Sequence, residues 1–327
     1  MRHTYTLYII ALLSAIVLTS CSDDFDINSV NSQPKLVLYC MPTVGDTTTI
    51  MLTRSLPVNH QGTVTDVDGA RITYTVNGKP ATIIAEGNGR YKAVARQTVG
   101  DRVSIEAEAD GLPAVSAQTT ILCPIAVDDV TTRRVTVYSD YWEQSRQYLQ
   151  LSASFSDPAG TKDYYAVRVR MLKFVRDYGD TSYAPYPEHD VDTVQEICEV
   201  NTESDPVLRR LNSIDYDFGY DDNDYEHFYV FTDDDFNGKT YTLRLNVYPE
   251  EISGGEAIVS PFYYVELYHI TPEFYHFVNS IGTIEKSDLT KIGLSNITPN
   301  VGNVRGGVGM AAGYALARSK IVRHVYE

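Results

Sequence analysis

The sequence has 327 residues, of which 43% are hydrophobic and 21% are charged, a balance that excludes a wholly disordered or collagen-like chain. Its 43 Asp and Glu residues outnumber its 27 Lys and Arg residues, so the formal net charge is −16. Nucleic acid repels a protein this acidic, and the composition therefore excludes a nucleic-acid binder of the usual kind.

The first 20 residues have the pattern of a signal peptide. A positively charged start precedes the apolar run LYIIALLSAIVL at 7–18, which is too short to span a bilayer comfortably. The run leads into LTSC at 18–21, which resembles a bacterial lipobox, where the cysteine is diacylated on its sulfur and becomes the new N-terminus. We therefore predict a signal peptide at 1–20 and lipid attachment at Cys21. The alternative is a general secretory signal with an incidental cysteine.

The residues after Cys21 form an acidic tether, which we assign to 21–34. They resemble the signal that exports Bacteroidota lipoproteins to the outer face of the outer membrane, and the residues that carry this resemblance are Ser22, Asp23, Asp24 and Asp26. Many disordered tethers are acidic without such a role, which is the alternative. The prediction is a protein anchored in the outer membrane by lipid and facing the cell exterior.

Short alternating segments fill the next part of the chain, 35–123. Thr, Val, Ile and Tyr dominate them, apolar residues recur at every second position, and turn sequences such as Asn77-Gly78 separate them. The predicted strands are 36–41, 47–54, 71–76, 81–85, 90–94, 102–109 and 114–121. A series of this kind predicts an immunoglobulin-like or fibronectin-like β-sandwich as the N-terminal domain.

The remaining residues, 124–327, predict a second β-rich domain with longer inserts. Its predicted strands are 134–139, 147–155, 164–174, 193–200, 227–232, 240–248 and 262–270, with a closing strand at 313–326. Thr271 and Pro272 supply the N-cap and first residue of a helix, whose apolar residues at 274, 277, 278 and 281 share one face. The predicted fold class is thus mainly β, with two β-sandwich domains and one C-terminal helix packed on the second.

The cysteines other than Cys21 are Cys40, Cys123 and Cys198. None lies in a CxxC motif, and three cysteines cannot all pair within one chain. We predict three small buried residues, while a bridge between Cys40 and Cys123 stays open as an alternative.

Two motif-like segments are better explained by structure than by chemistry. The segment DDDFNG at 233–238 matches the start of a calcium loop, but Arg244 stands where calcium needs a bidentate glutamate, so we predict an Asx/Gly turn. The run Gly307-x-Gly309-x-x-Ala312 imitates a dinucleotide fingerprint without room for the βαβ unit, so we predict glycines that allow close packing. With no GxSxG and no HExxH, we predict no catalytic residue, no metal, no cofactor and no enzymatic activity.

An acid- and tyrosine-rich segment between Leu211 and Gly238 holds nine acids and no Lys or Arg. Like charges at this density repel one another, so a basic partner surface or a bound calcium ion would offset the repulsion. A solvated loop is the alternative. The candidate binding surface consists of Tyr216, Tyr220, Asp221, Asp222, Asp224 and Tyr225.

Several segments together resemble an uncharacterised family of Bacteroidota outer-membrane lipoproteins called domain of unknown function 4249. They are PKLVLYCMPTVGDTTTIMLTRSLPV at 34–58, DGARITYTVNGK at 68–79, FTDDDFNGKTYTL at 231–243, HITPEFYHFVNSI at 269–281, LSNI at 294–297 and RGGVGMAAGY at 305–314. The resemblance implies a two-part, mainly β lipoprotein that is often found with TonB-dependent receptors and has no established catalytic residues.

The sequence is compatible with two functions. The preferred one is a non-enzymatic cell-surface lipoprotein that docks on, or captures ligand for, a TonB-dependent transporter, because sandwich modules, a lipid anchor and the missing catalytic motifs agree. The alternative is a glycan-binding or glycan-processing surface lipoprotein of a polysaccharide utilisation locus, in which exposed aromatic residues beside carboxylates would stack on sugars.

Overall fold

The protein is described here by a computed structural model. The described residues are 33–55, 65–139, 144–176, 191–208, 213–214, 228–249, 261–286 and 302–323. The predicted signal peptide, the tether up to residue 32 and the candidate binding surface at 216–225 lie outside these ranges.

The first β-sandwich consists of two sheets. One sheet has the order β19 (Val308–Ala311), β1 (Leu36–Cys40), β2 (Gly45–Arg54), β7 (Arg90–Gln97) and β6 (Thr82–Gly87), with β3 (Thr65–Asp66) paired to β2. The other has the order β5 (Lys79–Pro80), β4 (Arg71–Val76), β8 (Arg102–Glu108) and β9 (Val115–Thr120). Their inward side chains form one core that includes Leu38, Tyr74, Tyr91 and Ile105.

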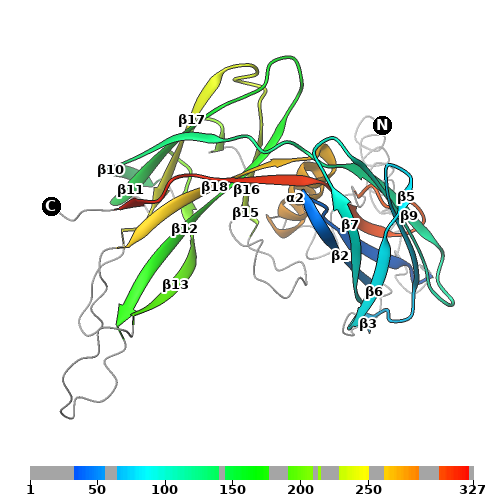
Figure 1. Ribbon diagram of the computed structural model, residues 1–327. Coiled ribbons are helices and arrows are strands. Elements are labelled where there is room, and N and C mark those ends of the chain that lie inside the picture. The colour runs from blue at the N-terminus through cyan, green and yellow to red at the C-terminus, as the bar shows by residue number, and fades with distance from the viewer. Residues whose placement is uncertain are drawn as a thin grey trace, which may run out of the picture. The chain divides into compact units, whose positions relative to one another are not determined.

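The second β-sandwich also consists of two sheets (Figure 1). One has the order β10 (Val127–Ser139), β11 (Gln144–Ser156), β17 (Thr240–Val247) and β14 (Val200–Asn201). The other, which we call the central sheet, has the order β15 (Ser213–Ile214), β16 (Phe228–Thr232), β12 (Tyr164–Arg176), β18 (Phe262–Ile270) and β20 (Tyr314–Arg318). In addition, β13 (Val191–Cys198) pairs with β12, and β21 (Val322–Arg323) pairs with β18.

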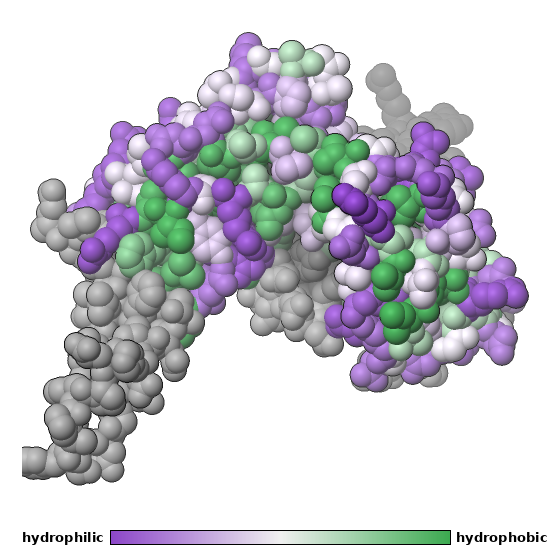
Figure 2. All heavy atoms as spheres, in the orientation of Figure 1, coloured by the Kyte–Doolittle hydropathy of each residue, from purple (hydrophilic) through white to green (hydrophobic). Residues whose placement is uncertain are grey.

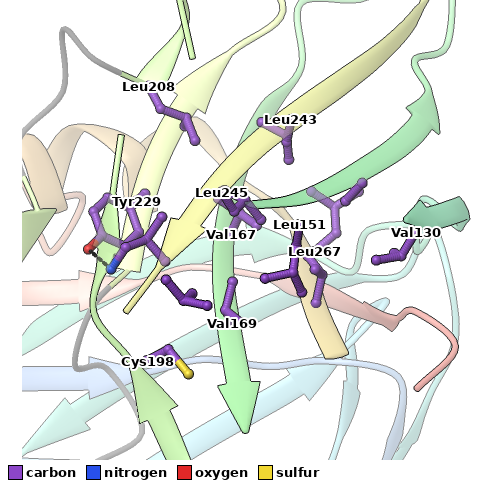
Figure 3. Packing of buried hydrophobic residues seen from close by; sticks show 14 of the residues in the cluster. Val130, Leu151, Val167, Val169, Cys198, Leu208, Tyr229, Leu243, Leu245 and Leu267 are labelled. Atoms are coloured by element: carbon purple, nitrogen blue, oxygen red, sulfur yellow. Dashed lines mark hydrogen bonds between the residues drawn. The ribbon is translucent and has the colours of Figure 1, made fainter. Parts of the chain in front are cut away.

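The core of the second sandwich lies between these two sheets, and Figure 3 shows its close packing. Side chains from β11 and β17 meet side chains from β12 and β18, as Leu151, Leu245, Val167 and Leu267 illustrate. Tyr229 fits into this apolar core because its hydroxyl accepts a hydrogen bond from the Val200 backbone N–H at 2.9 Å. The mainly β fold predicted from alternating residues is therefore confirmed.

The helix α2 (Pro272–Lys286) covers part of the other face of the central sheet. Phe274, Phe277 and Val278 are buried there, as the helical spacing predicts, and they form a separate core with side chains from β12, β16 and β18. Tyr39 packs against this core and lies edge-on to Phe277, with 5.8 Å between the ring centroids. The central sheet is consequently buried on one face by the sandwich and on the other, in part, by the helix.

Large apolar side chains are also exposed on the described surface. Figure 2 shows hydrophobic residues interspersed with hydrophilic ones on the face that it draws. Those that are more than a third exposed are scattered along the chain: Val44, Ile84, Val94, Val99, Tyr138, Val194, Tyr248 and Ile321. Single exposed residues of this kind are ordinary and mark no site. Among the described residues, no helix has the length and hydrophobicity needed to cross a membrane.

The strand β19 brings the C-terminal part of the chain into the first sandwich. It pairs in parallel with β1, and Ala311 belongs to the first core. The prediction of a single closing strand at 313–326 missed β19 and is replaced by three short strands, β19, β20 and β21. The boundary at 123–124 stays a prediction, but β19 places residues assigned to the second domain within the first core.

Glycines make the close approach of β19 to β1 possible. Gly309 has a φ of +107°, and a Cβ atom at this position would overlap the backbone oxygen of Leu38. At Gly307 a Cβ atom would overlap the backbone oxygen of Leu36. The structural role predicted for these glycines is therefore confirmed.

The three described cysteines are free. Cys40 and Cys198 are buried, as predicted, and burial raises the pKa of the Cys40 thiol to about 12. Cys123 is exposed, so its predicted burial was wrong, and the alternative of a Cys40–Cys123 bridge is excluded.

Replacing Gly309 with Ala tests the contact between β19 and β1. We expect the free energy of unfolding to fall by at least about 2 kcal/mol, because the variant adds both a strained φ and an overlap with Leu38. Gly100→Ala is the matched control, since Gly100 has a φ of +85° but no atom within 4 Å of the position that a Cβ atom would take. Urea unfolding measures both variants, and equal losses would contradict the packing of β19 on β1.

Candidate functional site

Strand register brings charged side chains together on the central sheet. Even-numbered residues of β12 and β18 lie on the face that carries α2, while odd-numbered ones lie in the sandwich core. The pairing places Arg168 opposite Glu266, and Glu266 opposite Arg318. These three side chains, which we call the charged row, therefore lie beside one another across β12, β18 and β20.

Glu266 is the shared acceptor of the charged row, and none of its side chain is exposed. Its Oε2 accepts hydrogen bonds from Nε and Nη2 of Arg168 at 2.9 and 2.6 Å, and from Nε of Arg170 at 3.0 Å. Its Oε1 accepts a hydrogen bond from Nε of Arg318 at 2.9 Å. One buried carboxylate thus fixes three guanidinium groups through charge-assisted hydrogen bonds.

The arginines keep Glu266 ionised. Burial by itself would raise the pKa of the Glu266 carboxyl, but the charge of Arg168 and the hydrogen bonds from the three arginines outweigh it and lower the pKa to about 2. The hydrogen bond to Glu266 also raises the pKa of Arg318. Glu266 is therefore ionised at neutral pH.

Aromatic rings fix the most buried arginine. The Arg168 guanidinium carbon lies 4.9 Å from the ring centroid of Phe228 and 5.6 Å from that of Tyr268. Its Nη2 also donates to the Tyr268 hydroxyl at 2.7 Å. Burial raises the pKa of Tyr268, so this hydroxyl stays protonated and donates in turn to Glu266 Oε2 at 3.1 Å.

A cavity of about 330 Å³ opens beside the charged row. Its volume lies near the lower end of the range of small-molecule sites. The side chains of Arg168, Arg170 and Arg318 line it together with apolar residues from four elements: Phe228, Ile270, Phe274 and Leu316. The arrangement combines fixed positive charge with an apolar wall, which suits binding rather than acid–base chemistry.

A second constellation lies on the sandwich side of the central sheet, where three buried carboxylates converge. One oxygen from each of Asp157, Asp163 and Asp233 lies within 4.8 Å of the others. Asp157 accepts hydrogen bonds from the Tyr165 hydroxyl at 2.5 Å and from the Gly238 N–H at 2.7 Å. These are oxygen ligands of the kind that a divalent cation takes.

Hydrogen bonds within the chain also explain why these three carboxylates lie close together, because they join the turn at 157–163 to the turn at 233–239. The Asn237 side-chain amide donates to Asp233 Oδ2 at 2.6 Å and to the Thr161 backbone oxygen. A ring nitrogen of His269 lies 3.2 Å from Asp163 Oδ1. Residues 233–239 form a turn between β16 and β17, in which Gly238 has a φ of +70°, so the predicted Asx/Gly turn is confirmed.

The site residues predicted from the sequence lie outside the described residues. This holds for Cys21, for the export signal at 22–26 and for the acid- and tyrosine-rich surface at 216–225. The structure brings together a different set, the charged row, which the sequence analysis missed. The sequence does hold a sign of the charged row. Arg168 and Arg170 stand two positions apart and so share one face of β12, and Glu266 is a charged residue within the aromatic strand β18.

Comparison with known families gives one assignment. The family model described as "Domain of unknown function (DUF4249)" matches residues 22–320, and no curated protein matches the sequence. The match spans both sandwiches, α2 and the charged row.

Replacing Glu266 with Gln tests the ion network through its pH dependence. The folded-state pKa of about 2 lies below the ordinary 4.5, so ionised Glu266 stabilises the fold above pH 4.5, and this stabilisation is lost as the pH falls toward 2. The shift corresponds to about 3 kcal/mol at neutral pH. We expect the difference in unfolding free energy between wild type and E266Q to shrink between pH 7 and pH 3.

The matched control for this experiment is Glu108→Gln. Glu108 pairs with Arg71 on the surface, where 52% and 80% of the two side chains are exposed. Such a pair contributes only about 0–1 kcal/mol. A difference for E266Q that stays constant with pH, or that matches E108Q, would contradict the ionised state of Glu266.

Proposed function

We propose that this chain, which belongs to the family described as Domain of unknown function (DUF4249), is a non-enzymatic, lipid-anchored protein of the outer membrane. Facing the cell exterior, it captures a small ligand for a TonB-dependent transporter. The observation that carries the capture role is the cavity beside the charged row, because it offers rigid binding groups to a small molecule.

The rigidity of the cavity walls supports binding as the function. Each of the three arginines donates at least one hydrogen bond to Glu266, so the charged wall is arranged before any ligand arrives. The apolar wall is equally fixed, since Ile270 and Phe274 belong to the core beneath α2. A preorganised site loses less entropy on binding, which favours affinity without catalysis.

The proposed lipid anchor and the proposed location at the cell surface rest on the sequence. The apolar run at 7–18, the LTSC sequence at 18–21 and the acids that follow agree in length, order and composition with a lipoprotein leader. Contact with the transporter is assigned to the acid- and tyrosine-rich surface, where aromatic side chains offer contact area and carboxylates offer steering toward a cationic patch.

Changing Cys21 to Ala tests the anchor. We expect the variant to leave the membrane fraction on a carbonate wash, because it has lost its site of lipid attachment. A triple variant, Asp23→Ala with Asp24→Ala and Asp26→Ala, should keep its lipid but become resistant to protease added outside the cell. Retention of the Cys21 variant in washed membranes would contradict the anchor.

A second experiment tests the contact with a transporter. A variant with Tyr216, Tyr220 and Tyr225 changed to Ala, and Asp221, Asp222 and Asp224 changed to Asn, should reach the surface but lose its transporter on purification from solubilised outer membranes. The control exchanges the exposed acids Asp46 and Asp110 of the first sandwich for Asn. Co-purification at wild-type levels with the first variant would place the docking surface elsewhere.

A further inference from the structure

A second cavity, which we call the polar groove, opens over the outer face of β8 and β9 in the first sandwich. Its volume is about 410 Å³. Residues of these strands alternate between the core and the outer face, and the outer ones that line the groove are polar: Ser104, Glu106, Ser116 and Gln118. Strand pairing places Glu106 opposite Ser116, so the floor of the polar groove is a paired sheet.

The walls of the polar groove come from segments that are distant in the sequence. The segment before β19 lies along β9, because Arg305 exchanges two backbone hydrogen bonds with Ser116, at 2.8 and 3.0 Å. The side-chain amide of Asn303 fixes the same segment, since it donates to the Gln118 backbone oxygen at 2.9 Å. The first turn of α2 supplies the remaining wall through Glu273. The charged side chains of the groove therefore start from fixed backbone positions.

Charged side chains of both signs line the polar groove without pairing. In the part of the chain that the structure describes, the side chains of Glu106, Glu273 and Arg305 form no ion pair and no hydrogen bond. Two carboxylates and one guanidinium thus line one cavity, yet neither carboxylate lies within ion-pair distance of the guanidinium. A ligand that carries both charges would pair with both signs at once.

The chemistry of the lining selects among ligand classes. A carboxylate accepts hydrogen bonds from an ammonium group, and the planar guanidinium of Arg305 matches the geometry of a carboxylate. An anionic ligand would meet the repulsion of Glu106 and Glu273, whereas a cationic ligand would leave Arg305 without a partner. A ligand with one ammonium and one carboxylate group satisfies all three side chains.

We propose that the polar groove binds a small zwitterion, with its ammonium group on Glu106 and Glu273 and its carboxylate on Arg305. The ligand class is an amino acid or a short peptide with free ends. This inference goes beyond the proposed function, because the polar groove shares no lining residue with the cavity beside the charged row.

NMR titration of the purified full chain tests the charge requirement. Glycine and triglycine are the zwitterions, and each is compared with its amide, which lacks the carboxylate, and with its N-acetyl form, which lacks the ammonium group. We expect the better zwitterion to bind at least about threefold more tightly than either blocked form, as two solvent-exposed ion pairs allow, and to weaken as salt is raised. The better of the two zwitterions distinguishes a free amino acid from a peptide.

Two variants and a matched control locate the binding. We expect R305Q to weaken binding of the zwitterion by about threefold or more without affecting its amide, since the amide has no carboxylate. E106Q should weaken the zwitterion and its amide but not the N-acetyl form. R96Q changes an exposed arginine of β7, on the other sheet of the same sandwich, and should change binding less than about 1.5-fold. Melting temperatures establish that the variants are folded.

Three results would overturn the inference: no binding of either zwitterion, blocked forms that bind as tightly as the zwitterion, or equal effects of R305Q and R96Q. A loss that R305Q causes equally for the zwitterion and its amide would also contradict it, because a structural change weakens both. None of these results bears on ligand capture in the cavity beside the charged row, which other residues line.

Discussion

Glu266, with none of its side chain exposed, accepts hydrogen bonds from Arg168, Arg170 and Arg318, and the face of the central sheet that carries α2 is organised around it. A buried carboxylate is tolerated only when its partners compensate the loss of hydration. Here the three arginines supply that compensation and hold the pKa of the Glu266 carboxyl below its ordinary value. Because the acceptor sits between two strands that each supply arginine, the network joins β12, β18 and β20 and cannot form until all three are in register.

The two faces of the central sheet consequently have different roles. Odd-numbered residues such as Val167 and Leu267 complete the sandwich core. Even-numbered residues divide that other face between an apolar area beneath α2 and the charged row beside it. This division places fixed guanidinium groups next to aromatic rings, the combination on which the proposed capture of a small ligand depends.

The fold was largely predictable, whereas the site was not. Alternation in β12 and β18, and the proline and apolar spacing of α2, gave strands and a helix close to those observed. The strand β19 escaped prediction because Gly307 and Gly309 interrupt its pattern and because its pairing with β1 spans most of the chain. The sequence also does not predict the cluster of Asp157, Asp163 and Asp233, because tertiary contacts bring these residues together.

The charged row shows most clearly what the sequence does not predict. A strand whose charged residues all lie on one face predicts that this face contacts water. Only the register shows that Arg168 lies opposite Glu266 and is buried. An NMR titration of the Glu266 side-chain carboxyl carbon tests the central claim most directly. The account predicts a pKa of about 2, because three arginines hold the buried carboxylate ionised. A pKa at or above the ordinary 4.5 would contradict it.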